Sequence, residues 1–393
     1  MKERIVLFTI VFGLGIFLYI FQSYFNTVWG LAFLCTAMTI YCIFMNLAYK
    51  FKKRKLQKHP KVINENYKPF VSVMIPCHNE ESVIEHTVKN ILNMDYEKFE
   101  VIVIDDRSTD NTPNVIKNLE KQYDNVKILI RQPGAFPGKS AVLNDAFVLA
   151  KGDAVLVFDA DATVDSDFLS KLIPEIEPKD VGAVQARKII RNKDFNFLTR
   201  CQNNEYTMDT HFQVGRDSVK GAVELRGNGE LIKREALESI GGWNNFTITD
   251  DLDMSTRLHI KGWDVRFCQD AKVYEEGIVY LWPLFRQRRR WLEGTIRRYL
   301  EYFGDVLTSK EMSLRASLDM TAYISQFIMP LWLIMEFLIR GFKVLAKDAP
   351  PHMLYSSIII GFVIGVGFFV AARYALRRYD NLSRKDALIQ ATE

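Results

Sequence analysis

Long apolar segments near both ends constrain the fold of this chain more than any other feature. They cover Ile5 to Phe21, Val28 to Tyr49, Met320 to Ile339 and Met353 to Ala372. Each is close to the ~20 residues that an α-helix needs to cross a bilayer. We therefore expect two transmembrane helices in residues 1–52, two more and a short cytosolic tail in residues 317–393, and a polar domain between them.

Soluble alternatives exist for these segments. A cleaved signal peptide would explain the first one, but no small-x-small cleavage site closes it and a second apolar segment follows at once. Buried helices of a soluble protein would explain the last two, but both are long and carry little internal charge. Glu336 is the exception, and a carboxylate at that depth should face protein or a water-filled path.

Basic residues next to the apolar segments predict the orientation in the membrane. Lys50, Lys52, Lys53, Arg54, Lys55 and Lys58 follow the second segment, and Arg373, Arg377 and Arg378 follow the fourth. The positive-inside rule places both flanks, and with them the polar domain, in the cytosol. Arg340, Lys343 and Lys347 fall in the predicted outer loop and weaken the rule slightly. We expect a multi-pass protein of the cell (plasma) membrane with a cytosolic catalytic domain.

The composition gives no sign of nucleic-acid binding or of disulfide bonds. The net charge is +4, and basic residues beside the membrane segments account for much of it, which indicates a lipid bilayer as a partner and no nucleic acid. The five cysteines show no metal-binding or redox spacing. Free thiols in a cytosolic domain are the simplest interpretation.

The polar domain has the pattern of an α/β fold. We expect strands at Phe70–Ile75, Val101–Ile104, Val126–Ile130 and Ala154–Phe158, and helices at Glu80–Asn93, Thr112–Tyr123 and Ser140–Ala150. Strands that alternate with helices predict a mostly parallel, Rossmann-like sheet. Such sheets bind ligands at the carboxyl ends of their strands.

Acidic residues follow three of these strands. Glu80 follows the first, the pair Asp105-Asp106 the second, and Asp159-Ala-Asp161 the fourth. A turn or a helix cap would explain any one of them, and we prefer that explanation for Asp110. Asp159 and Asp161 are two residues apart, so on an extended backbone both side chains point to one face. Their oxygens suit Mg²⁺ or Mn²⁺.

Several motifs together resemble the membrane synthases of glycosyltransferase family 2, which have the GT-A fold. They are the stretches Val71 to Glu80, Val103 to Asp110 and Gly138 to Asn144, then the D-x-D, Thr249-Asp-Asp251, and Gln287-Arg-Arg-Arg-Trp291. The resemblance covers residues 68 to 300 and the membrane layout. The full set of motifs is similar to that of the membrane synthases of cellulose, chitin, hyaluronan and poly-N-acetylglucosamine. In size and number of spans the chain most resembles the bacterial poly-N-acetylglucosamine synthases.

This resemblance implies roles for the acidic residues. Asp251 corresponds to the family's catalytic base, which takes the proton of the acceptor hydroxyl. Asp250 stands where Glu is usual, and this departure weakens any assignment of the substrate by analogy. Metal contact falls mainly to Asp161. Asp253 follows two residues later and could be a helix cap.

The resemblance also implies contacts to the donor and the acceptor. Glu80, Asp105, Asp106 and Lys139 correspond to nucleotide-binding positions, and Lys139 could otherwise be solvated surface. Gln287, Arg290 and Trp291 would hold the diphosphate and the acceptor. Arg226-Gly-Asn228-Gly, which we expect to precede a helix, resembles an acceptor-side loop, with a simple glycine turn as the alternative. A basic amphipathic helix at the membrane surface, from Leu281 to Leu300, also explains the arginines.

These roles define three functional hypotheses. The first is an inverting transferase that adds sugar from a UDP-sugar, by resemblance UDP-N-acetylglucosamine, to a growing β-linked polysaccharide acceptor that is exported across the membrane. A small accessory membrane subunit or self-association would then complete the export path, which Asn46 and Glu336 suggest. The second is a membrane glucosyltransferase that makes a glycolipid on ceramide or diacylglycerol. The third is a non-catalytic scaffold, which the complete acidic set disfavours. We expect a GT-A domain in residues 53–280 and interfacial helices in residues 281–316.

Overall fold

The computed structural model describes residues 2–21, 28–59, 63–351 and 353–392. The chain forms two compact units. One unit comprises residues 52–317, and the other comprises residues 1–51 together with residues 318–393.

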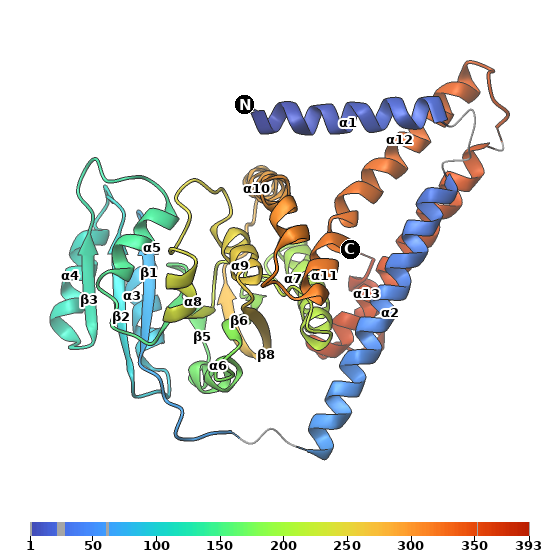
Figure 1. Cartoon of the computed structure of the whole chain (residues 1–393). Coiled ribbons are helices and arrows are strands. Elements are labelled where there is room, and N and C mark those ends of the chain that lie inside the picture. Colours follow the sequence, from blue (N-terminus) through green and yellow to red (C-terminus); the bar gives the residue numbers. More distant parts are fainter. Residues whose placement is uncertain (1, 22–27, 60–62, 352, 393) are drawn as a thin grey trace. The chain divides into compact units, whose positions relative to one another are not determined.

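A single eight-stranded sheet organises the unit of residues 52–317 (Figure 1). In chain order its strands are β1 (Val71–Cys77), β2 (Phe99–Asp105), β3 (Val126–Ile130), β4 (Ala154–Val157), β5 (Thr163–Val164), β6 (Val181–Ile190), β7 (Glu230–Lys233) and β8 (Asp264–Glu275). In space they follow the order β3-β2-β1-β4-β7-β6-β8-β5. The four predicted strands are confirmed and are mutually parallel.

The other half of the sheet is mixed. Strand β7 is antiparallel to both of its neighbours, β4 and β6, whereas β6 and β8 run parallel. Strand β5 closes the edge antiparallel to β8. Because β7 reverses the direction, the loop that enters β7 lies at the same sheet edge as the end of β4.

Helices cover this sheet. They are α3 (Ile84–Leu92), α4 (Thr112–Gln122), α5 (Lys139–Phe147), α6 (Phe168–Ile176), α7 (Phe197–Ser218), α8 (Arg234–Ser239), α9 (Asp250–Ile260) and α10 (Leu281–Thr308). The first three match the predicted helices within a few residues. Helix α5 packs on β1 and β2, and α6 and α7 pack on β6 and β8. The apolar core lies between the sheet and these helices and includes Ile75, Val103, Leu156 and Phe168.

One prediction about this unit is wrong. Arg226-Gly-Asn-Gly229 precedes strand β7 and not a helix. Glu230 and Lys233 are charged, so the sequence Glu230-Leu-Ile-Lys233 does not have the pattern of a buried strand. The strand is nevertheless buried throughout, because both side chains form hydrogen bonds inside the fold.

The remaining helices belong wholly or partly to the second unit. They are α1 (Lys2–Phe21), α2 (Val28–Lys58), α11 (Leu314–Tyr323), α12 (Ser325–Leu345), α13 (Met353–Tyr379) and α14 (Arg384–Gln390). Within the described residues, three segments are long and apolar enough to cross a membrane: Trp29–Lys58, Leu314–Leu345 and Met353–Tyr379. Helix α1 is not among them, so a fourth span stays a prediction.

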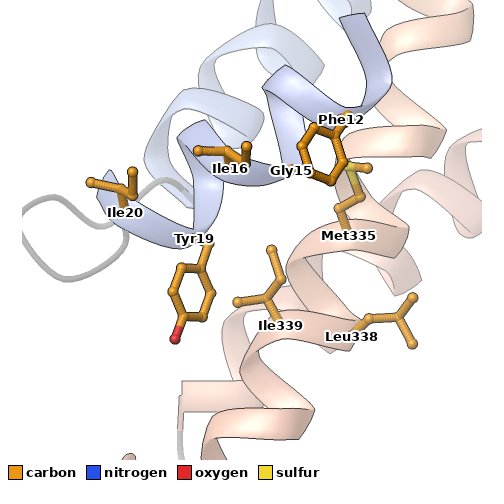
Figure 2. Close-up of a pocket in the computed structure, with 8 residues that line it drawn as sticks. All are labelled: Phe12, Gly15, Ile16, Tyr19, Ile20, Met335, Leu338 and Ile339. Carbon is orange, nitrogen blue, oxygen red and sulfur yellow. The ribbon is translucent and has the colours of Figure 1, made fainter. Parts of the chain in front are cut away.

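The charge inside the third predicted span is neutralised within its own unit. Glu336 is fully buried and accepts hydrogen bonds from Arg340 Nε at 2.8 Å and Trp332 Nε1 at 3.3 Å. Arg340 therefore lies in α12, four residues from its partner, and the helix extends beyond the predicted span that ends at Ile339. Asn46 donates to the carbonyl of Cys42 in its own helix. An apolar cavity of about 630 Å³ separates α1 from α12 and is lined by Phe12, Tyr19 and Met335 among others (Figure 2).

Candidate active site

The predicted acidic residues meet at the carboxyl edge of the parallel strands. Strand β1 ends three residues before Glu80, β2 ends at Asp105, and β4 ends two residues before Asp159. The ends of adjacent parallel strands share one edge, which explains why residues so distant in sequence converge. Burial raises the pKa of Glu80, and so do the charges of Asp161, Asp110 and Asp159.

Lys139 is held among carboxylates at this edge. It begins α5 directly after Gly138, which has a φ of 108° and so takes a backbone conformation that side chains disfavour. Its Nζ donates to Asp159 Oδ1 at 2.6 Å and to the carbonyl of Gly227 at 2.9 Å. Burial would lower the pKa of Lys139, but the charges of Asp159 and Asp250 outweigh burial and raise it. The ammonium group therefore stays charged beside the D-x-D.

Asp159 and Asp161 fit a divalent cation. Burial raises the pKa of Asp161, and the carboxylates of Asp159 and Glu275 raise it further, so negative charge is concentrated here. In the described part of the chain no three His, Cys, Asp or Glu side chains form a metal cluster. Two carboxylates suffice for Mg²⁺, which takes its other oxygens from water and substrate phosphates.

Asp105 and Asp106 occupy different environments. Asp105 is 1% exposed, and its Oδ2 accepts from the backbone N–H of Ser108 at 3.2 Å. Its Oδ1 is buried without a hydrogen bond to any described residue, which leaves an acceptor for a ligand. Asp106 is paired with Arg107 at 2.9 Å and with Arg131 at 2.7 Å, so its charge is already compensated.

The pair Asp250-Asp251 lies in the first turn of α9, where the helix dipole favours negative charge. Asp251 Oδ1 accepts from the N–H of Leu252 at 2.8 Å. Its Oδ2 would lie 3.3 Å from a Cβ placed on Gly227, so this carboxylate abuts the Arg226–Gly229 loop. Burial raises the pKa of Asp251 to about 6, with a further contribution from Asp250. A carboxylate with such a pKa suits a general base near neutral pH.

Glu230 is a third carboxyl group beside this pair, and the sequence reasoning missed it. It is fully buried at the start of β7, and its Oε2 accepts from the N–H of Gly227 at 3.3 Å. Burial raises its pKa to about 8, and Asp250 and Asp251 add to the rise. Glu230 is therefore mainly protonated at neutral pH. A carboxyl residue directly after Gly-Asn-Gly is a signal that could have revealed it.

A second missed cluster surrounds Glu275 at the end of β8. Its carboxylate accepts from Lys188 Nζ at 2.9 Å, Tyr206 Oη at 2.5 Å and Asn228 Nδ2 at 3.2 Å. Asn228 Oδ1 in turn accepts from the N–H of Asp159 at 3.3 Å. The cluster therefore ties the predicted acceptor loop to the D-x-D. Charged residues at the ends of adjacent parallel strands, β6 and β8, were the available signal.

Arg226 and Glu224 anchor the same loop. Arg226 pairs with Asp209 at 2.6 Å and with Glu224 at 2.9 Å. Glu224 is 1% exposed and also accepts a hydrogen bond from Nη1 of Arg298, in α10, at 2.9 Å. Burial would raise the pKa of Glu224, but Arg298, Arg216 and Arg226 lower it well below its usual range. Asp253 is likewise buried and binds Arg257 and Tyr302, so it is an internal ion-pair partner and not a helix cap.

The Q-R-R-R-W motif lies on α10, and Trp291 faces the Glu275 cluster. Lys188 Nζ lies 5.9 Å from the centre of the Trp291 ring. The guanidinium of Arg288 lies 4.1 Å from that ring centre and also pairs with Glu205 at 2.7 Å. Gln287 accepts a hydrogen bond from Arg288, and Arg290 is exposed. The structure thus brings Trp291 to the site and leaves Arg290 open to solvent.

Comparison with known proteins identifies the class. Residues 69–294 match the family described as "Glycosyltransferase like family 2". A mannosyltransferase from Pyrobaculum calidifontis, solved in complex with GDP-Man and Mn²⁺, has a similar structure. Its TM-score is 0.64 at 21% identity over 92% of this chain and 97% of that one. The chain belongs to glycosyltransferase family 2 and has the GT-A fold.

Individual relatives differ in the product that they make. The chain is 42% identical to a beta-monoglucosyldiacylglycerol synthase of Nostoc over 72% of its own length and 60% of the relative. The Synechocystis enzyme of the same name is 41% identical over 67% of this chain and 55% of that one. A poly-beta-1,6-N-acetyl-D-glucosamine synthase of Staphylococcus epidermidis is 28% identical over 70% of this chain and 67% of the relative. The chain thus spans about 60% of the length of the glycolipid synthases that it matches.

Proposed function

We propose that this protein transfers a hexose, with inversion, from a UDP-sugar to the hydroxyl of a diacylglycerol-type lipid in the membrane. The observation that carries the choice of acceptor is the 42% identity to a beta-monoglucosyldiacylglycerol synthase, against 28% for a polysaccharide synthase. By the same similarity UDP-glucose is the favoured donor, in place of the UDP-N-acetylglucosamine expected from the sequence.

The environment of Trp291 supports a lipid acceptor. In an enzyme that holds a growing polymer, this ring would offer a face to the terminal sugar. Here the guanidinium of Arg288 lies over the ring at 4.1 Å and is held by Glu205. The guanidinium of Arg288 therefore already occupies one face of the indole. A lipid hydroxyl needs no such platform, and a glycolipid needs no path for a polymer through the membrane helices.

Asp251 serves as the general base of the proposed reaction. It accepts the proton of the acceptor hydroxyl while that oxygen forms a bond to the anomeric carbon of the sugar. The bond from this carbon to the diphosphate oxygen breaks on the opposite side, so an α-linked donor gives a β-linked product. Glu230 stays protonated beside the pair and limits the negative charge around the base. Gly227, against Asp251, lets the acceptor loop approach closely.

Basic and acidic groups at the strand ends hold the donor. Asp105, with its free buried Oδ1, and Glu80 bind the nucleoside, and Lys139 binds the diphosphate at the start of α5. Asp159 and Asp161 would hold Mg²⁺ or Mn²⁺, which neutralises charge on the leaving diphosphate. Arg290, which is exposed and belongs to the same motif as Trp291, is the proposed partner of the diphosphate.

A polysaccharide product is the second candidate, because Gln287, Arg290 and Trp291 complete the motif that favours retention of a polymer. Acceptor-dependent release of UDP separates the two. The purified protein in lipid nanodiscs is given UDP-glucose or UDP-N-acetylglucosamine, with and without dioleoylglycerol. We expect UDP release that requires both UDP-glucose and dioleoylglycerol. Sustained release without added lipid acceptor, with a product that stays in the aqueous phase, would support the polysaccharide.

A further inference from the structure

Asn144 lies at the end of the motif from Gly138 to Asn144, and no step of the proposed reaction uses it. Its side chain contacts the loop of residues 241–249, which joins α8 to α9. We call residues 241–249 the base loop, because α9 carries Asp251. Asn144 itself lies on α5, the helix that begins at Lys139. One side chain therefore joins the helix of Lys139 to the loop that leads into the helix of Asp251.

Asn144 pairs with the backbone of Trp243 as a neighbouring strand would. Its Oδ1 accepts from the N–H of Trp243 at 2.9 Å, and its Nδ2 donates to the carbonyl of Trp243 at 2.8 Å. The same Nδ2 donates to Asn245 Oδ1 at 2.9 Å. An amide side chain carries both a donor and an acceptor, which the N–H and C=O of one residue together require. These hydrogen bonds fix the middle of the base loop on α5.

Packing around Trp243 reinforces this attachment. Trp243 is 3% exposed, and its ring meets that of Phe147, at the end of α5, edge to face with the ring centres 6.0 Å apart. Gly242 has a φ of 77°, and a Cβ there would lie 2.6 Å from Asn144 Oδ1. The loop can approach Asn144 so closely only because residue 242 has no side chain. The base loop thus packs directly on α5.

The base loop has further contacts on both sides of the site. Asn244 Nδ2 donates to Asp253 Oδ1, in the first turn of α9, at 3.1 Å. The ring of Phe246 meets that of Phe136, three residues before Lys139, edge to face with the ring centres 5.7 Å apart. A continuous set of contacts therefore runs from α5 through the base loop to the first turn of α9.

A fixed arrangement of these elements matters for a direct displacement, in which the base and the leaving diphosphate lie on opposite sides of the anomeric carbon. Misplacement of a catalytic group by about 1 Å can cost about 10²-fold in rate. We propose that Asn144 is a positioning residue that fixes the base loop, and through it Asp251, relative to the helix that begins at Lys139. This role rests on the proposed function, in which Asp251 is the base and Lys139 binds the diphosphate, whereas the attachment of the loop does not.

Hydrogen–deuterium exchange tests the attachment without any transfer reaction. In full-length Asn144→Ala protein in detergent, the amides of residues 241–249 should exchange at least tenfold faster than in wild type, because the N–H of Trp243 loses its acceptor. Exchange in β1 should be unchanged, which separates a local effect from general unfolding. Asn144→Ser, a milder change, should give the same pattern and serves where the alanine variant folds poorly. Unchanged exchange in the base loop, or equal acceleration in β1, would overturn the proposal.

Kinetics with a matched control test the positioning role. Asn90, on α3, makes the same pair of hydrogen bonds with the backbone of Val164, at 2.8 and 3.2 Å, away from the base loop. Asn144→Ala should lower kcat at least tenfold, with the donor KM and the affinity for UDP and Mn²⁺ within threefold, since Lys139 keeps its place. Asn90→Ala should lower Tm by a similar amount but kcat by less than threefold. Equal losses of kcat in the two variants, or a loss confined to the donor KM, would overturn the proposal.

The acid limb of the pH–kcat profile is a readout that a loss of stability alone would not move. A loosened base loop admits water to Asp251, whose raised pKa depends mainly on burial. Both variants keep the charged groups that also act on this pKa: Asp250, Arg226 and Lys139. The limb should move to lower pH in Asn144→Ala and stay in place in Asn90→Ala. A limb that stays in place in both would overturn the proposal. Faster exchange confined to the base loop of Asn144→Ala, in a protein that glycosylates no lipid, would refute the proposed function alone.

Discussion

Gly294 of α10 lies against Thr249, the residue that precedes Asp250 and Asp251. A Cβ at position 294 would lie 2.4 Å from Thr249 Cγ2 and 2.8 Å from Thr249 Oγ1. The helix that carries Trp291 therefore touches the start of the helix that carries the proposed base, Asp251. A side chain at position 294 would clash with Thr249, so this glycine lets α10 lie close to the proposed base.

Gly294→Ala should push α10 away from Thr249. Overpacking of this kind costs about 1–3 kcal/mol, and we expect kcat to fall at least tenfold because Trp291 moves relative to Asp251. Thr249→Ala should be tolerated, since Thr249 Oγ1 has no hydrogen-bond partner among the described residues. The double variant should recover most of the activity. Failure of Thr249→Ala to restore activity would show that the contact does not position the site.

Asp251→Asn should lower turnover by about 10²–10⁴-fold, the usual contribution of a general base. Donor affinity, measured by calorimetry with UDP and Mn²⁺, should be retained because Asp251 does not hold the nucleotide. Asp253→Asn is a useful comparison. It breaks the ion pair with Arg257 and should lower thermal stability in detergent along with activity. A large loss of donor affinity in Asp251→Asn would contradict its assignment as the base.

The fall in activity at acidic pH should follow the protonation of the proposed base, Asp251. A general base acts when deprotonated, and burial together with Asp250 raises the pKa of Asp251, the proposed base, to about 6. Activity should therefore fall about tenfold per pH unit below pH 6. In Asp250→Asn the neighbouring charge is gone, the pKa of Asp251 drops, and the limb should move to lower pH. An unchanged limb in that variant would mean that another group controls it.

Glu230→Gln should keep most of the activity at pH 7, because the carboxyl is mainly protonated there with a pKa of about 8. A carboxyl with a raised folded pKa binds more protons in the folded state, so its contribution to stability falls as pH rises from its unfolded pKa through 8. The Tm of wild type should therefore decline between pH 6 and pH 8 more steeply than that of Glu230→Gln. Parallel Tm curves would show that Glu230 ionises normally.

Loss of one member of the Lys188–Glu275 ion pair should lower stability more than replacement of both members. Each side chain is 13% exposed, and Lys188→Met would leave Glu275 unpaired beside Asp161. Loss of one partner of a buried pair costs about 3 kcal/mol or more. Lys188→Met/Glu275→Gln should regain stability, since Gln still accepts from Tyr206. Additive losses in Tm for the two changes would argue against the coupling.

The sequence predicted the first half of the sheet well and the second half poorly. Val71–Cys77 and Phe99–Asp105 are continuous apolar strands, and parallel order follows from their alternation with helices. Strand β7 was missed because its end residues, Glu230 and Lys233, are charged yet buried. Only tertiary partners, the N–H of Gly227 and the carbonyl of Pro178, make that burial possible, and local pattern does not reveal them.

The candidate site shows the same limit. Asp159, Asp161 and Asp251 could be found because short motifs contain them. Lys188, Tyr206 and Glu275 could not, because they come from three separate elements and meet only when β6 and β8 pair. The product could not be predicted from the motifs either. Polymer and glycolipid synthases share these motifs, and the sequence alone favoured a polysaccharide.

The most direct test of the account is the structure of the product. Full-length protein in nanodiscs receives ¹³C-labelled UDP-glucose, dioleoylglycerol and Mg²⁺, and the organic phase is analysed by mass spectrometry and NMR. We predict a monoglucosyl lipid with a β-anomeric linkage, absent in Asp251→Asn. A labelled high-mass polymer in the aqueous phase, or an α-anomeric lipid, would contradict the account.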